Sequence, residues 1–322
     1  MRSKLYILVL SILLLAGLSI AETTMKLERV QQMKASDLDV LSAVWSPDGS
    51  MLALTQANSR GIYLMDAVSG QVETITEEVA AGYRFAWSAD GRQIAYKATV
   101  DPAAALKAVK LVDLRTGQIT PLSQQSTDVG VPSLLPDGRF GFTFEGAFLI
   151  VDAEGRVLET IPDIASNVAT VSHDGQWILY NDRQDRIWAH HLTDGERFQA
   201  TPDGRRFFNP VWSPTEPVAI VNELGGSFHL LDLQGANLLP LDNGNHYVWS
   251  ADGRSILYDV TEDDGYNITA ADIYVINRDG TGRAALTATA QELEMYPSCS
   301  RTDRIAFSQP DGSVFTALMV AQ

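Results

Sequence analysis

The sequence predicts an all-β protein, a β-propeller of seven four-stranded blades, with six blades as the alternative. One turn motif recurs along the chain, and short strands of alternating polarity follow each copy. Successive copies begin about 37 to 50 residues apart, which is the length of one propeller blade. Helical periodicity is nearly absent after the first segment. The chain therefore repeats one four-stranded unit.

The turn motif reads Trp-Ser-x-Asp-Gly in its best copies. It begins, in order, at Trp45, Trp87, Leu134, Val171, Trp212, Trp249 and Cys299. Aspartate bonds backbone amides two residues ahead and glycine accepts a positive φ, so the motif reverses the chain between two strands. The tryptophan is expected to wedge between neighbouring sheets, where its indole nitrogen needs a partner.

The strands after the first copy are Met51–Thr55, Ile62–Met65 and Val72–Ile75. After Cys299 only two further strands fit, so the seventh blade lacks its outer strand. The segment Met25–Val30 is predicted to supply it. Pairing of the two chain ends would close the ring and remove an exposed sheet edge.

The N-terminal segment has the pattern of an export signal. Arg2 and Lys4 precede an apolar run from Leu5 to Ile20, and small residues stand before a cleavage point after Ala21. Residues 1–21 are predicted to be the signal peptide and residues 22–322 a single propeller domain. An uncleaved anchor is the alternative. The predicted location is periplasmic or secreted, without stable membrane insertion after cleavage.

The charge excludes some partners. The 322-residue chain has a formal net charge of −16, and loss of Arg2 and Lys4 leaves 22 basic residues against 40 acidic ones, about −18. Such a chain repels nucleic acid and anionic membranes. Cys299 is the single cysteine, so no intrachain disulfide forms. We expect a monomer.

The segment Asp272–Gly282, followed by Ala285-Leu286-Thr287 and preceded by Trp249–Gly253, resembles the propeller repeat of the TolB family. That resemblance implies a periplasmic, protein-binding propeller. TolB proteins also have an α/β domain before the propeller, and this sequence enters its first blade too early to include one. The repeat is specific for the fold and far less specific for a function.

The segments that enter the innermost strands surround the channel mouth of a propeller, and they are the predicted binding surface. They contain Asp37, Asp39, Tyr83, Arg84, Asp128, Asn167, Arg206, Phe207, Asn209, His246, Tyr247, Glu292, Glu294 and Tyr296. An acidic and aromatic rim suits a basic peptide. The predicted function is therefore a non-catalytic scaffold for a protein or peptide partner, with no required cofactor.

Two alternatives remain open. A propeller-type polysaccharide lyase or hydrolase would use His246, Tyr247, Arg206 and Glu294 in the channel, although the sequence provides no serine elbow and no metal-binding histidine set. An acidic insertion offers weak calcium ligands at Asp259, Glu262, Asp263 and Asp264, without the regular spacing of a calcium loop.

Overall fold

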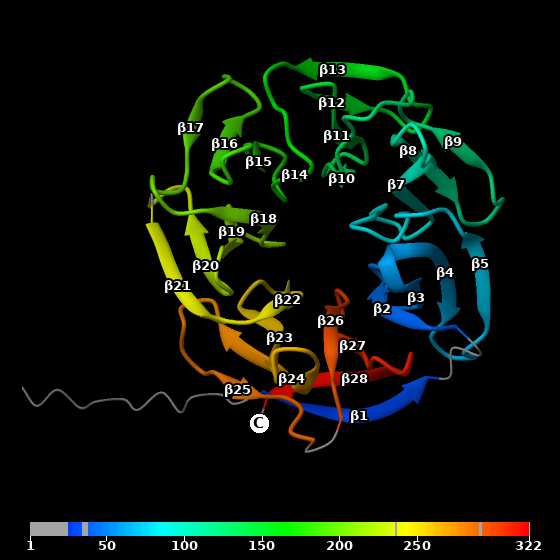
Figure 1. The fold of residues 1–322 in the computed structure, drawn as a ribbon, viewed down its shortest axis with the longest axis vertical. Helices are drawn as coiled ribbons and strands as arrows, with labels where there is room; N and C mark the ends of the chain where they lie inside the picture. The colour runs from blue at the N-terminus through cyan, green and yellow to red at the C-terminus, as the bar shows by residue number, and fades with distance from the viewer. Residues whose placement is uncertain (1–24, 34–37, 236, 290–291, 322) are drawn as a thin grey trace, which may run out of the picture.

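The computed structural model describes residues 25–33, 38–235, 237–289 and 292–321. The predicted signal peptide and Asp37 lie outside these residues. The strands form seven four-stranded antiparallel sheets, arranged as blades in a ring (Figure 1). The prediction of seven blades is confirmed. The only helical segment within the described ranges is the 3-10 turn η1 (Ala57–Ser59), and none of the helical structure there is long and apolar enough to cross a membrane.

Each blade is numbered in chain order and its strands run from the centre outwards. Blade 1 contains β2 (Val40–Trp45), β3 (Met51–Gln56), β4 (Arg60–Asp66) and β5 (Val72–Thr76). Blade 2 contains β6 (Ala86–Trp87), β7 (Gln93–Asp101), β8 (Leu106–Asp113) and β9 (Ile119–Pro121). Blade 3 contains β10 (Ser133–Leu134), β11 (Phe140–Phe144), β12 (Ala147–Val151) and β13 (Val157–Ile161). Blade 4 contains β14 (Ala169–Val171), β15 (Trp177–Asn181), β16 (Ile187–His191) and β17 (Arg197–Gln199). Blade 5 contains β18 (Phe207–Trp212), β19 (Val218–Glu223), β20 (Ser227–Asp232) and β21 (Asn237–Asn243). Blade 6 contains β22 (Asn245–Trp249), β23 (Ser255–Asp263), β24 (Ile268–Asn277) and β25 (Ala284–Ala285). Blade 7 contains β26 (Met295–Cys299), β27 (Arg304–Ser308), β28 (Val314–Ala321) and, from the other end of the chain, β1 (Met25–Met33).

The ring is closed by pairing of the two chain ends. β1 runs antiparallel to β28, from Met25 opposite Ala321 to Met33 opposite Val314. In Figure 1 the blue β1 lies beside the red β28 at the outer edge of blade 7. The predicted closure is confirmed, and the strand extends beyond Val30. A bulge at Arg29 and Val30 interrupts the pairing.

The apolar core is divided among the seams between blades. Seven buried clusters are found in the described residues, each formed by two neighbouring blades. Between blades 5 and 6, for example, Phe228 meets Tyr258 edge to face, with ring centroids 4.9 Å apart. Because alternate residues of a strand face opposite neighbours, each blade contributes to two seams.

The tryptophans of the turn motif lie at these seams, as predicted. Trp249 Nε1 donates to the carbonyl of Val211 at 3.1 Å, and Trp212 Nε1 donates to the carbonyl of Thr170 at 3.0 Å. The indole nitrogens of Trp45 and Trp87 are also buried, but they have no hydrogen-bond partner within the described ranges. The predicted indole partner is therefore present in two of the four motif copies that keep tryptophan.

The motif turns lie together on one side of the ring, which we call the exit face. In the first copy the Ser46 hydroxyl donates to Asp48 Oδ1 at 2.7 Å, and this bond lowers the pKa of the Asp48 carboxyl below its ordinary value. Asp48 Oδ1 also accepts from the Ser50 amide, and Gly49 has a φ of 71°. The predicted turn chemistry is confirmed.

Candidate functional site

The opposite side of the ring is the entry face. It contains the segments that lead into the innermost strands and the hairpin loops between second and third strands, because antiparallel strands return to the same side after two passes. The connection between β5 and β6 projects toward the centre of the ring (Figure 1). Most predicted rim residues lie on this face.

Four predicted rim residues have a strained backbone. Arg84, Asn209, His246 and Tyr296 have positive φ values of 52°, 56°, 47° and 56°. The last three sit in β-bulges at the start of β18, β22 and β26. A residue with a side chain pays about 1–3 kcal/mol for such a conformation. Strain of this kind gathers at binding and catalytic sites more than elsewhere.

Asp259 is the centre of a group of contacting side chains on this face. Its side chain is fully buried, at 0% exposure. Oδ1 lies 2.7 Å from His246 Nδ1 and accepts from the Tyr296 amide at 3.0 Å. Oδ2 has no hydrogen-bond partner in the part of the chain that the structure describes. A single carboxylate therefore joins the strained residues of blades 6 and 7.

His246 and Tyr296 stack on each other beside this carboxylate. Their ring centroids are 4.0 Å apart, with the planes tilted by 37°. The His246 side chain is 39% exposed. The bond at Nδ1 orients the imidazole and leaves Nε2 available to another molecule.

Glu294 is a second buried carboxyl on the same side. It is 3% exposed, and Oε1 accepts from the Thr289 hydroxyl at 2.6 Å. Oε2 is buried without a partner in the described ranges. Burial raises the pKa of this carboxyl, and the negative charge of Asp272 contributes to the rise. The site thus holds two carboxyl groups, each with one oxygen that has no partner among the described residues.

A ring of polar residues underlies the entry face, and sequence reasoning missed it. In every blade the apolar part of the second strand is followed by a polar side chain. These residues are Thr55, Lys97, Thr143, Asn181, Asn222, Asp259 and Ser308. Several bond the entry segment of the next blade: Thr143 donates to the Ser166 carbonyl and Ser308 to the Leu41 carbonyl. A polar position recurring in the same place in seven repeats is the signal that could have revealed it.

Lys97 is the only cation of this polar ring. The residue is 5% exposed, and its ammonium donates to Asn167 Oδ1 at 2.6 Å and lies 5.8 Å from the centre of the Tyr83 ring. No carboxylate of the described residues lies within 4 Å of it. Burial lowers the pKa of the Lys97 amine to about 8, and the Lys107 ammonium adds to the shift. A buried cation without a counter-ion is costly to the fold.

Lys97→Met is therefore expected to stabilise the protein at pH 7. The amine has a lower pKa in the folded chain than its ordinary 10.5. The free-energy cost of burying the charged amine is therefore fully present below about pH 8, and it decreases as the pH rises toward 10.5. Urea unfolding of both proteins at pH 7 and pH 9.5 measures this. The variant should gain about 1–3 kcal/mol at pH 7 and less at pH 9.5. An equal gain at both pH values would contradict the prediction.

One predicted rim residue is buried in a seam between blades instead. Phe207 is 0% exposed and packs in the seam of blades 4 and 5, so its prediction as a rim contact is wrong. Tyr247 is half-buried, stacks on Phe228 and donates to the Asn209 carbonyl at 2.9 Å. Arg206 is exposed and donates from Nε to Asp185 at 2.9 Å.

Arg84 lies in the segment between β5 and β6, which enters blade 2. Burial raises the pKa of the Tyr247 hydroxyl above its ordinary value, and the positive charge of Arg84 opposes part of that rise. Tyr83, its neighbour, is 36% exposed. These two residues remain on the rim.

A pocket of about 270 Å³ opens beside Tyr296 on the entry face. Its lining includes Asp39 and Tyr296 together with the apolar side chains of Val40, Met295 and Pro310. Asp39 is exposed. Glu292 lies near this pocket and accepts from Gln309, another lining residue, at 2.6 Å. The structure thus brings Asp39, Glu292 and Tyr296 to one place.

The four calcium candidates are not brought together. Asp259 is buried, whereas Glu262, Asp263 and Asp264 are exposed at the tip of the β23–β24 hairpin. Asp259 and Asp263 are four residues apart on one strand, about 13 Å at the usual rise. Asp263 and Asp264 bond backbone amides of their own hairpin. No group of three or more acidic, histidine or cysteine side chains in the described residues could hold a metal ion.

No protein-family model matches the chain, and no curated protein matches its sequence. A solved chain from the "Crystal Structure of Mitotic Checkpoint Complex" matches it with a TM-score of 0.64 and 15% identity, covering 99% of each chain. The two chains share the propeller fold. At this identity the likeness shows the fold alone, and the 1555 matching solved chains show how widely the fold is used.

The propeller fold accounts for where the entry-face residues lie. Their role has to be inferred from the chemistry of their side chains. A WD-like repeat fold is shown. The similarity to the TolB family stays a prediction from the sequence, as do export and the location of the protein.

Proposed function

We propose that this chain is an exported, non-catalytic propeller that binds a protein or peptide partner at the channel mouth on its entry face. The observation that carries the proposal is the concentration of destabilising features there. Strained residues such as His246 and Tyr296, the buried carboxyls of Asp259 and Glu294, and the buried Lys97 all lie on this side. Features that cost stability and gather at one surface favour a binding role for that surface.

The partner's chemistry follows from the pocket beside Tyr296. Apolar walls from Val40, Met295 and Pro310, together with the exposed carboxylate of Asp39, suit a long basic side chain. The aliphatic stem of a lysine or arginine would lie on the walls with its charge at Asp39. The formal net charge of −16 attracts such a partner from a distance. We therefore infer a loop or an extended peptide with a basic side chain.

Other findings support a protein partner and export. The similar solved chain belongs to a structure titled as a complex. The basic start and apolar run before Ala21 have the pattern of a signal peptide, and the TolB-like repeat Asp272–Gly282 is used by periplasmic binding propellers. Cell fractionation with N-terminal sequencing tests export, which predicts a chain beginning after Ala21.

A display library of random peptides tests the binding site. We expect the protein to enrich peptides with lysine or arginine beside apolar residues, and Asp39→Asn and Tyr296→Ala each to weaken the selected peptides about tenfold, or ~1.4 kcal/mol. Glu154→Gln removes one negative charge from the exit face and is the matched control. An equal loss of peptide affinity in Glu154→Gln, or no enrichment of basic peptides, would overturn the proposal.

The Asp259–His246 pair favours one second candidate, an enzyme of the lyase or hydrolase type. A carboxylate that bonds Nδ1 at 2.7 Å prepares the other ring nitrogen to accept a proton. Turnover of anionic oligosaccharides that is lost in His246→Ala would establish it. Absence of turnover, with peptide binding intact, would favour the scaffold.

A further inference from the structure

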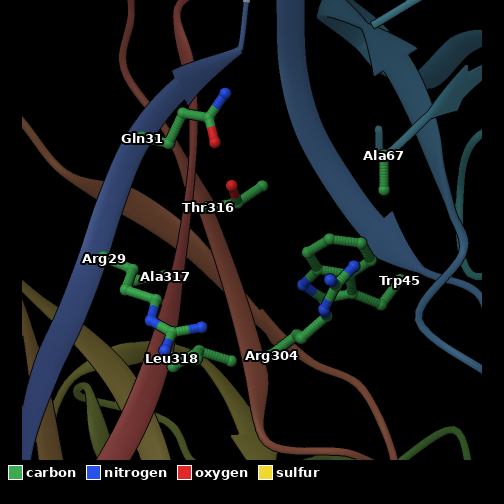
Figure 2. A pocket seen from close by; sticks show the side chains of 8 residues that line it. All are labelled: Arg29, Gln31, Trp45, Ala67, Arg304, Thr316, Ala317 and Leu318. Atoms are coloured by element: carbon green, nitrogen blue, oxygen red, sulfur yellow. The ribbon is translucent and has the colours of Figure 1, made fainter. Parts of the chain in front are cut away.

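A second pocket lies at the seam where the ring closes, away from the entry face. It has a volume of about 150 Å³ and lies between β1 and β28 of blade 7 and the Trp45 end of β2 in blade 1 (Figure 2). Ala67 and Arg304, which flank exit-face turns, line it as well. None of the residues assigned to the candidate site takes part.

Two arginines face this pocket. Arg29 has a φ of 54° in the bulge of β1, and Figure 2 shows its guanidinium reaching inward, opposite Trp45 and Arg304. Arg304 lies over the Trp45 ring at 5.5 Å and donates from Nη1 to the Gly49 carbonyl at 2.8 Å. Within the described ranges neither guanidinium has a carboxylate within 4 Å, and the pocket is lined by no acidic residue. Among the described residues, two guanidiniums without a carboxylate partner thus line opposite sides of one pocket in a chain with a net charge of −16, and this indicates an anion.

Trp45 forms part of the pocket wall. Trp45 is 5% exposed, and its indole nitrogen is buried without a partner in the described residues. Trp212 and Trp249 occupy the same motif position, and both donate to a carbonyl of the preceding blade. A buried donor left unpaired is costly to the fold. Trp87 is also unpaired but does not line this pocket, so the site is defined by the indole together with the two guanidiniums.

The donors come from four strands. Arg29 is on β1, Arg304 on β27, Trp45 on β2, and Thr316 on β28 adds a hydroxyl. A tetrahedral oxyanion presents acceptors in several directions at once, whereas the two oxygens of a carboxylate lie in one plane. The volume admits a group of this size. We propose that this pocket binds a small tetrahedral oxyanion of the phosphate or sulfate class.

Binding would strengthen the ring closure. The ion would contact β1 and blade 1 together, and β28 is the strand of blade 7 with which β1 pairs. A ligand that binds only the closed ring stabilises it in proportion to its occupancy. The oxyanion is thus expected to raise the melting temperature of the protein.

NMR of the indole N–H groups tests the site directly in the mature chain. The protein has six tryptophans, so a ¹⁵N-labelled sample gives six indole signals, and Trp45→Phe identifies one of them. Titration with potassium phosphate or sulfate, against chloride at equal ionic strength, should shift the Trp45 signal in a saturable way. Arg29→Gln should raise the Kd about tenfold, and Arg115→Gln, which removes an exposed arginine outside the pocket, should leave it unchanged.

Several results would overturn the proposal. These are the absence of a Trp45 shift, an equal shift with chloride, or an unchanged Kd in Arg29→Gln. A preference for succinate over both tetrahedral ions would overturn the assignment of the ion class. If Trp45→Phe does not fold, the test uses wild type and Arg29→Gln instead. The same ions should selectively broaden one indole signal in wild type, and this broadening should be lost in Arg29→Gln.

Discussion

Removal of β1 is expected to lower the melting temperature of the protein by about 10 °C or more. β1 buries Met33 in the seam of blades 7 and 1 and places Met25 and Leu27 against the seam of blades 6 and 7. Full burial of a side chain such as Met33 contributes about 1.5–3 kcal/mol, and the half-buried Met25 and Leu27 contribute less. The truncated chain would also expose the edge of β28, which invites aggregation. Calorimetry of the chain with and without residues 22–33 measures the effect.

Rescue by a peptide separates loss of closure from general damage. A synthetic peptide of the β1 sequence Met25–Met33 should pair with β28 and restore most of the lost stability, as a donated strand does. A scrambled peptide of equal composition is the control and should not restore it. A melting temperature of the truncated chain within 2 °C of wild type would show that closure is not what holds the ring.

Asp259→Ala is expected to destabilise the protein by about 2–4 kcal/mol. The change leaves the Tyr296 amide without its acceptor and releases His246. Asp259→Asn keeps one oxygen acceptor and should cost less than half as much. Chemical unfolding of the three proteins at pH 7 measures the difference, and equal costs for both substitutions would contradict it.

A second-site change tests whether Asp259 holds Tyr296 in its strained conformation. Glycine tolerates the φ of 56° at position 296. Tyr296→Gly should therefore relieve backbone strain in wild type and relieve less of it in Asp259→Ala, where the Tyr296 amide is released and the backbone can relax. Additive effects in the double variant would show that the bond between Asp259 and the Tyr296 amide does not carry the strain.

The fold could be predicted from the sequence because its determinants are local. Asp48 and Gly49 act within one turn, and the same turn recurs in each blade. Even the pairing of β1 with β28 followed from counting strands in the last repeat. The site was less predictable, since topology places a residue near the channel mouth without fixing where its side chain points. Phe207 and Tyr247 show this difference.

The β-bulges are the physical reason why the directions of these side chains could not be predicted. An extra residue in a strand reverses which side each following residue faces, and the bulges at Asn209, His246 and Tyr296 leave no mark in the alternation of the sequence. Lys97 and Asp259 were missed as a related pair because they lie in different blades. The structural equivalence of their positions appears only when the second strands are aligned.

The division of the apolar core among seven seams has a consequence for how the protein can change. A substitution in one seam touches only the two blades beside it, so effects in remote sectors should add in free energy. One sector of the entry face could acquire a new specificity while the opposite sector keeps its geometry. In such a ring, the binding specificity can change during evolution while the fold stays the same.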